Sequence, residues 1–182
     1  MKAILIIISI IVLIGLGAVI FFQRERPFSK STIKTKMKIT SLAFNNNQPI
    51  PPRYTCDGNN INPPLSFSDI PAGLKSLVLI VDDPDAPLGT WAHWVVFNIP
   101  KEVREIKENS IPQGVQGTTS FGKPGYGGPC PPSGTHRYFF KLYALDTILP
   151  FTDKADKKAV EAVMQNHILT QVELIGLYSK NK

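Results

Sequence analysis

A glycine- and proline-rich segment at residues 125–138, GYGGPCPPSGTHRY, constrains the fold of this chain more than any other feature. It holds four glycines and three prolines in fourteen residues and runs directly into the apolar segment 139–145, FFKLYAL. Glycine adopts backbone angles closed to other residues, and proline fixes φ and lacks an amide hydrogen, so this composition excludes a helix or a regular strand. We expect a rigid loop that carries His136 and Tyr138 to the start of a strand.

The rest of the composition favours one β domain. The chain has 182 residues, of which 43% are hydrophobic and 19% charged, which is enough for one domain with a core and short for two. Its 16 prolines and 13 glycines indicate many turns. The predicted strands are 38–44, 76–81, 92–99, 115–120, 137–145 and 169–178. We expect an antiparallel, two-sheet, sandwich-like arrangement.

One helix is predicted near the C-terminus, over residues 153–167. Apolar residues recur there at helical spacing, and either Thr152 or Asp153 could cap its first turn.

The N-terminal segment predicts a membrane anchor. Residues 3–22 form an uncharged apolar run of twenty residues, and a helix of that length spans about 30 Å, the thickness of a bilayer core. The run exceeds the apolar core of a signal peptide and precedes a poor cleavage site, so we expect it to be retained. The predicted organisation is an anchor at 1–23, a basic tether at 24–37 and one domain at 38–182.

The net charge of +6 lies mostly in this N-terminal part. Residues 1–36 contain six basic residues and one acidic residue, whereas 37–182 contain 14 basic and 13 acidic residues. Because the domain lacks a basic stripe with interleaved aromatics, we expect no nucleic-acid partner. Basic residues after the apolar run favour a cytoplasmic domain, but an apolar run after the single Lys2 is how exported domains begin. We expect a single-pass membrane protein with an extracytoplasmic domain.

Two further segments contain polar side chains typical of a site. Val81–Pro87, VDDPDAP, places three carboxylates at the end of a buried strand, and Trp91–Trp94, WAHW, opens the next strand. The two-residue period of a strand puts Trp91 and His93 on one face and Trp94 on the other. If these strands are neighbours, five side chains converge, namely Asp83, Asp85, His93, His136 and Tyr138.

Other interpretations of these residues stay open. Carboxylates in a turn often accept hydrogen bonds from backbone amides, and Asp82 is the one expected to be structural. Two histidines with a carboxylate are also a known metal-binding set, although we expect no metal or other cofactor. Cys56 and Cys130 could form a disulfide that closes a loop of about 74 residues, worth about 4 kcal/mol in an oxidising compartment. They could equally be unpaired apolar fillers.

Three motifs in this order resemble the signature of the phosphatidylethanolamine-binding protein family. They are DPDAP at 83–87, WAHW at 91–94 and GPCPPSGTHRY at 128–138. The chain is most similar to the bacterial and archaeal, Raf-kinase-inhibitor-like branch, and the resemblance covers about residues 38–178. It implies a large antiparallel sheet with a smaller sheet packed on it, and a pocket for small anions such as phosphate groups. The pocket residues that it implies are Asp83, Asp85, Trp91, His93, Gly128, Pro129, His136 and Tyr138.

An anion beside two carboxylates needs compensating groups, because like charges repel. The candidates are protonated His93 or His136, the Tyr138 hydroxyl and the backbone N–H groups of Gly127 and Gly128. An unperturbed histidine gains its proton as the pH falls from about 8 to about 6, so we expect anion affinity to strengthen over that range.

The resemblance implies a binding or regulatory role rather than catalysis. We expect a non-enzymatic, membrane-anchored domain that holds a phosphate-like or carboxylate-bearing ligand, or a phospholipid headgroup. The alternative is a protein inhibitor of a serine protease or kinase that acts through loops around the pocket. A third possibility is a hydrolase that uses Asp–His acid–base chemistry. Mammalian members have a helix after the last strand, which this sequence lacks, so their kinase regulation is not transferred.

Overall fold

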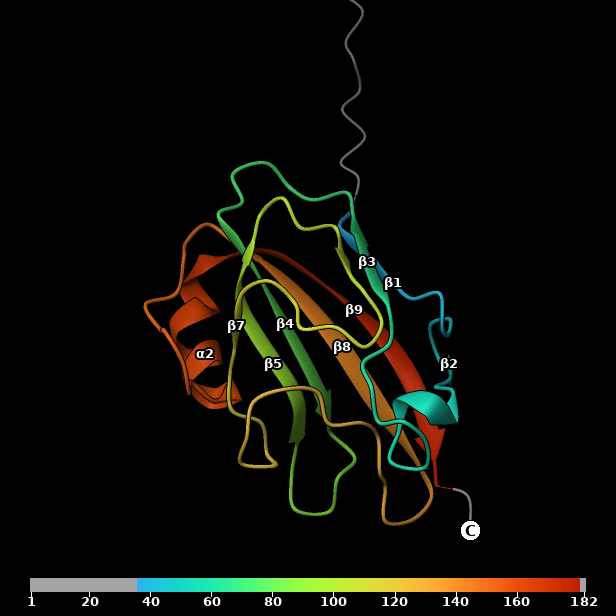
Figure 1. Cartoon of the computed structure of the whole chain (residues 1–182). Helices are drawn as coiled ribbons and strands as arrows, with labels where there is room; N and C mark the ends of the chain where they lie inside the picture. The colour runs from blue at the N-terminus through green and yellow to red at the C-terminus, as the bar shows by residue number, and fades with distance from the viewer. Residues whose placement is uncertain (1–35, 181–182) are drawn as a thin grey trace, which may run out of the picture. The chain divides into compact units, whose positions relative to one another are not determined.

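The computed structural model describes residues 36–180, which form a mainly β fold with two sheets (Figure 1). The larger sheet has the strand order β2-β9-β8-β4-β5-β7, and the smaller one has the order β1-β3-β6. The larger sheet consists of β2 (Gln48–Pro49), β4 (Ser76–Asp83), β5 (Trp91–Pro100), β7 (Val115–Gln116), β8 (Thr135–Leu145) and β9 (Ile168–Ser179). The smaller sheet consists of β1 (Lys38–Thr40), β3 (Leu65–Ser68) and β6 (Glu105–Ile106). The helical elements are η1 (Pro52–Tyr54), α2 (Lys157–Met164) and η2 (Gln165–His167).

The centre of the larger sheet is β4, which pairs antiparallel with β5 on one side and with β8 on the other. All eight of its residues are buried, as expected of an uninterrupted apolar run with both faces covered. β8 continues the sheet by pairing antiparallel with β9 along its whole length. The three long apolar runs of the sequence therefore lie side by side, so the condition for the expected convergence of site residues is met.

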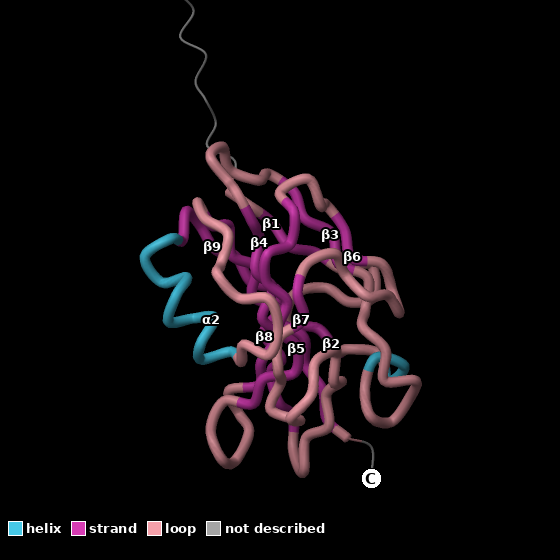
Figure 2. Tube along the Cα trace, turned by 60° about the vertical axis from the view of Figure 1, so that its left-hand side comes forward, coloured by secondary structure: helices cyan, strands magenta, loops and turns pink. Residues whose placement is uncertain are grey.

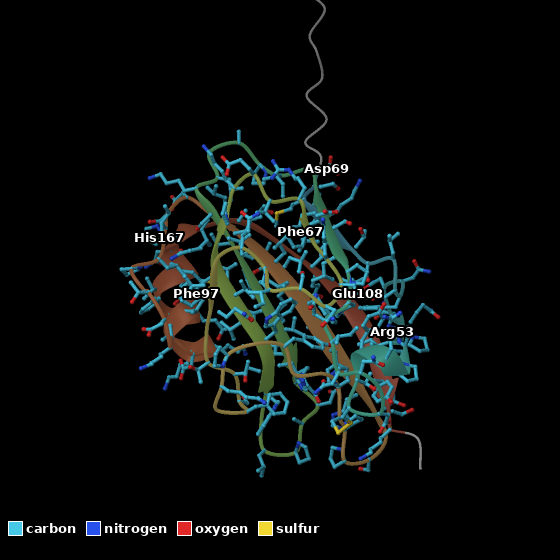
Figure 3. The ribbon with its side chains drawn as sticks, viewed as in Figure 1. Arg53, Phe67, Asp69, Phe97, Glu108 and His167 are labelled. Carbon is cyan, nitrogen blue, oxygen red and sulfur yellow. A yellow bond between two sulfur atoms is a disulfide. The ribbon has the colours of Figure 1, made fainter. Side chains whose placement is uncertain are left out.

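Two hydrophobic clusters cover the two faces of this sheet. One cluster lies between the sheets and includes Leu79, Phe140 and Phe67, while the other lies under α2 and includes Phe97 and Val160. The smaller sheet and α2 lie on opposite sides of the larger sheet (Figure 2). Figure 3 labels one residue of each cluster, Phe67 between the sheets and Phe97 under α2. The arrangement confirms a mainly β fold with one helix near the C-terminus.

Several predicted boundaries differ from the structure. The first strand ends at Thr40 rather than at residue 44, and β7 covers only the first two residues of the stretch predicted at 115–120. Strands β3 and β6 were not predicted, because four and two residues are too few to show alternation. The larger sheet is not wholly antiparallel, since β2 pairs parallel with β9.

The helix begins later than the sequence predicts. Asp156 is the N-cap, and its side chain accepts a hydrogen bond of 2.8 Å from the Ala159 amide, so neither Thr152 nor Asp153 caps α2. The chain just before Asp156 is held by the loop after β7, because the Thr118 amide donates to the Ala155 carbonyl at 3.0 Å. This backbone contact keeps the preceding residues out of the helix.

The described residues correct the predicted localisation. Among residues 36–180, none of the helices has the length and apolar character needed to cross a membrane, which contradicts the expected single-pass membrane protein with an extracytoplasmic domain. The anchor predicted at 1–23, with its membrane contact at 3–22, and most of the tether at 24–37 lie outside the described residues.

The position of the N-cap gives a stability prediction. Replacing Asp156 with alanine removes the acceptor for the Ala159 amide, so we expect Asp156→Ala to lower the free energy of unfolding by about 1 kcal/mol. Asp153→Ala is the matched control, and its effect should stay within about 0.5 kcal/mol. Urea unfolding followed by circular dichroism measures both, and a larger loss for Asp153→Ala would contradict the assignment of the cap.

Candidate functional site

The candidate site lies at the end of the larger sheet where β4 ends and β5 and β8 begin. Asp83 is the last residue of β4 and pairs with Trp91 at the start of β5, and the neighbouring Asp82 pairs with Phe139 near the start of β8. Because β4 is antiparallel to both neighbours, its last residues lie beside their first ones. The loops in which the sequence predicts binding-site residues therefore meet at this end of the larger sheet.

Asp83 and His136 form a buried pair. The Asp83 carboxylate lies 2.7 Å from His136 Nδ1, and the side chains are only 5% and 10% exposed. The same carboxylate accepts the Asp85 amide at 2.8 Å. Since an ionised carboxylate only accepts hydrogen bonds, Nδ1 of His136 carries the hydrogen and its Nε2 points away from Asp83. The negative charge of Asp83 thus has a dedicated partner within the protein.

Asp85 is held by Arg137, a residue that the sequence analysis missed. The guanidinium donates two hydrogen bonds to the carboxylate, 2.9 Å from Nε and 2.6 Å from Nη2, and the Arg137 amide adds a third at 3.0 Å. These bonds lower the pKa of Asp85 to about 2. Asp85 therefore fastens the loop after β4 to the start of β8. The sequence did contain an indication of this separate role. The alternation of β8 places Arg137 on the opposite face of the strand from His136 and Tyr138.

His93 is bound on both its backbone and its ring to one glycine. Its Nδ1 lies 2.7 Å from the Gly127 carbonyl oxygen, and the Gly127 amide donates to the His93 carbonyl at 2.9 Å. The residue is 4% exposed, and this burial lowers the pKa of His93 below that of an ordinary histidine. His93 is therefore protonated only at a lower pH than an ordinary histidine, which was the basis for expecting anion affinity to strengthen between pH 8 and pH 6.

The His93 ring belongs to a chain of edge-to-face aromatic contacts. Its centroid lies 5.2 Å from that of Tyr138 and 5.4 Å from that of Phe121, and Phe121 in turn lies 5.5 Å from Trp91. Phe121 was not predicted as a site residue, because it stands alone in a polar loop. These contacts fix the orientation of the imidazole and place the half-buried Trp91 at the edge of the site.

Trp94 lies on the opposite face from the one predicted, and a β-bulge is the cause. Val81 pairs with Trp94 whereas the next residue, Asp82, pairs with Ala92, so His93 is an extra residue in β5. Strict alternation fails across such a bulge. Trp94 therefore packs in the cluster between the sheets, where its indole nitrogen donates to Gln116 Oε1 at 3.1 Å.

Tyr138 contains a buried hydroxyl group without a partner. The residue is 1% exposed, and its oxygen forms no hydrogen bond to any other group of residues 36–180. Asp83 and the Cys130 amide lie close enough to affect the hydroxyl, but neither meets hydrogen-bond geometry. Burial, followed by the charge of Asp83, raises the pKa of Tyr138 strongly. The hydroxyl is therefore a neutral donor at physiological pH. Asp83, His93, His136 and Tyr138 are called the histidine cluster below.

The glycine- and proline-rich loop forms one side of the site and is fastened to residues 51–60. The Gly128 amide donates to Asn60 Oδ1 at 2.7 Å, and the Pro129 carbonyl accepts the Cys56 amide at 3.0 Å. Cys56 and Cys130 are joined in a disulfide, which decides between the two states that the sequence left open. The Gly127 and Gly128 amides, expected to bind an anion, are thus both bonded within the protein.

Asp82 is on the opposite face of β4 from the histidine cluster. It is fully buried, and Lys141 of β8 and Lys157 of α2 each approach its carboxylate to 2.9 Å. This network ties α2 to the sheet, which agrees with the structural role expected of Asp82.

The histidine cluster is compact. Surface hollows of about 480 and 360 Å³ lie elsewhere, and neither is lined by a member of the cluster. Within the described part of the chain, no group of three or more His, Cys, Asp or Glu side chains could hold a metal ion.

Comparison with known proteins identifies relatives over the whole of this domain. The family model described as phosphatidylethanolamine-binding protein matches residues 40–179. A UPF0098 protein of Methanothermobacter thermautotrophicus is 52% identical over 150 residues, which cover 79% of this chain and 99% of that protein. A UPF0098 protein of Aquifex aeolicus is 48% identical, covering 80% of this chain and 90% of that protein.

Solved structures agree with this result. The putative phosphatidylethanolamine-binding protein homolog CT736 of Chlamydia trachomatis has a TM-score of 0.78 and 44% identity, covering 80% of this chain and 99% of that one. YbcL of E. coli, described as a member of the mammalian family, has a TM-score of 0.76 and 31% identity, covering 81% of this chain and 100% of that one.

The Asp85–Arg137 pair predicts a pH-dependent stability. The pKa of Asp85 is lowered to about 2 in the folded protein and is about 3.9 in an unfolded chain, so the pair stabilises above pH 4 and its contribution is lost as the pH falls towards 2. Because the pair is partly exposed, Asp85→Asn should cost at most about 1 kcal/mol at pH 7. Urea unfolding of both proteins between pH 7 and pH 2.5 should show this difference shrinking, and a constant difference would contradict the ion pair.

The close approach of the two loops predicts that Gly128 tolerates no side chain. A Cβ at this position would lie 2.5 Å from the Tyr54 carbonyl oxygen and 2.9 Å from Thr55 Cα, which are backbone atoms that cannot rotate away. We expect Gly128→Ala to destabilise the fold by about 2 kcal/mol. Ser133→Ala, an exposed change in the same loop, is the control for thermal unfolding, and equal melting temperatures would show that the loops are not packed this closely.

Proposed function

The chain belongs to the phosphatidylethanolamine-binding protein family, and on this premise we propose that its histidine cluster is a non-enzymatic binding site for a small phosphate-like anion. The proposal concerns the described domain and requires no cofactor. A carboxylate-bearing ligand presents a similar pair of oxygen acceptors and belongs to the same class.

The observation that carries the proposal is the Tyr138 hydroxyl. A buried polar group without a hydrogen bond costs about 1–3 kcal/mol, and this one lies 99% buried on a ring that packs against His93. A bound acceptor oxygen would satisfy it. The hydroxyl is held in place by the ring packing between Tyr138 and His93, so the donor is oriented before a ligand arrives.

The electrostatic obstacle to anion binding is smaller than the sequence implies. Asp83 is paired with His136, and Asp85 is paired with Arg137 through three hydrogen bonds. Each carboxylate therefore has a positive or hydrogen-donating partner of its own. An incoming anion meets compensated carboxylates rather than two free negative charges.

A second candidate function is protein binding by the loops around the cluster, as expected of a protease or kinase inhibitor. It rests on Leu88 in the loop between β4 and β5, which is 95% exposed. A protein partner that covered this loop would remove the exposed apolar side chain from water, which favours binding. This role would leave the histidine cluster free, so substitutions in the cluster would separate the two functions.

Tyr138→Phe tests the proposed site. The change removes only the hydroxyl and keeps the ring, so we expect phosphate affinity to fall at least tenfold, which corresponds to about 1.4 kcal/mol. Stability should be unchanged or slightly higher, because an unpaired buried hydroxyl is removed.

Tyr143→Phe is the matched control, since Tyr143 lies on the same strand but packs in the cluster under α2. Isothermal titration calorimetry with inorganic phosphate measures both variants. Equal affinities of wild type and Tyr138→Phe would remove the hydroxyl from the site, and undetectable binding by the wild type would refute the proposal.

A further inference from the structure

We infer that the histidine cluster selects an anion that still carries a proton, such as a singly protonated phosphate or phosphomonoester, and discriminates against sulfate and phosphodiesters. The inference rests on the proposed function and narrows it to one chemical class of ligand. It follows from the direction of a single hydrogen bond, the one between His93 and the Gly127 carbonyl.

The Gly127 carbonyl fixes the tautomer of His93. Its oxygen lies 2.7 Å from Nδ1, and a carbonyl can only accept, so the ring hydrogen must be on Nδ1. In the neutral imidazole the other nitrogen, Nε2, then carries a lone pair. Nδ1 is the only ring nitrogen of His93 with a hydrogen-bond partner among residues 36–180, so Nε2 is left as an acceptor for a ligand bound to the cluster.

The surroundings of His93 hold this orientation and favour the neutral ring. The ring is packed edge-to-face between Phe121 and Tyr138, and its backbone is tied to the same glycine by the Gly127 amide. Burial lowers the pKa of His93, and this effect is larger than the opposing effects of the Gly127 carbonyl, Asp83, the Gly128 backbone and, from the opposite face of β4, Asp82. A rotated ring would lose the bond to Gly127.

The remaining groups of the cluster do not remove the need for a donor on the ligand. Tyr138 supplies a hydroxyl hydrogen. His136, with Nδ1 directed to Asp83, offers Nε2 as a donor when charged and as a second acceptor when neutral. In either state the lone pair of His93 requires a hydrogen from the ligand. An oxygen atom without a proton would face this lone pair and be repelled.

Common anions differ in whether they can supply that hydrogen. A phosphate monoester has a second pKa of about 6, so near neutral pH it retains a P–OH group in part of its population. Sulfate and phosphodiesters retain none. A site built to hydrogen-bond a hydroxyl rejects an analogue that lacks it by large factors. A phospholipid headgroup, which is a diester, is therefore disfavoured relative to a free or singly esterified phosphate.

The test compares two ligand pairs on the wild-type protein at pH 6.0 by isothermal titration calorimetry. The first pair is inorganic phosphate and sulfate, which have the same tetrahedral shape. The second pair is monomethyl phosphate and dimethyl phosphate. We expect the protonated member of each pair to bind at least tenfold more tightly. Sulfate carries the larger negative charge at this pH, so charge alone would give the opposite order in the first pair.

Two further measurements address His93 itself. His93→Phe keeps an aromatic ring between Phe121 and Tyr138 but removes the acceptor, so the preference for phosphate over sulfate should fall below threefold. His167→Phe, at a histidine paired with Asp146 away from the site, should retain it. Nitrogen-15 spectra of the wild-type imidazoles provide a readout that does not depend on a variant folding, and they should show a protonated Nδ1 and an unprotonated Nε2 at pH 6.0–7.5.

The outcomes separate this inference from the function on which it rests. Phosphate binding with equal or tighter sulfate binding would overturn the inference and leave the anion site intact, as would a protonated Nε2 on His93. Failure of all four probes to bind would overturn both.

Discussion

The candidate site depends on the antiparallel packing of β4 between β5 and β8. This arrangement brings the end of one strand beside the beginnings of two others, so the loop between β4 and β5 and the loop before β8 converge on Asp83. The hydrophobic faces of β4 fix its register, because a slip by one residue would turn Asp83 towards α2 and Asp82 towards the space between the sheets. The chemistry at the end of the sheet is therefore set by apolar burial along its length.

Much of the fold was predictable from the sequence, because the long strands are continuous apolar runs bounded by proline and glycine. The convergence of Asp83, His93, His136 and Tyr138 was predictable for the same reason. Short strands such as β3 and β6 carry too few residues for a periodic signal, and the start of α2 is set by a backbone contact with a distant loop. Such contacts depend on tertiary structure and have no local pattern.

The finer geometry of the site was less accessible. A bulge at His93 changes the face of Trp94, and no residue type in WAHW marks it. Arg137 lies on the other face of β8 from His136 and still binds Asp85, which stands in the loop after β4, where strand alternation no longer fixes the side. The Gly127 and Gly128 amides were candidates for the anion, but the chain uses them to fasten its own loops. The sequence can suggest which groups could donate hydrogen bonds to a ligand, whereas the three-dimensional structure shows which of them already have partners within the protein.

The disulfide between Cys56 and Cys130 has a consequence for proteolysis. It encloses every residue from 56 to 130, including the loop that presents Leu88 and the loop that presents Phe121. A protease that cuts either loop would leave two fragments still joined by a covalent bond. Because the histidine cluster draws residues from both sides of such a cut, a nicked molecule would keep all of its members in one covalent assembly. Cleavage beside the site could thus alter its rim without releasing any part of it.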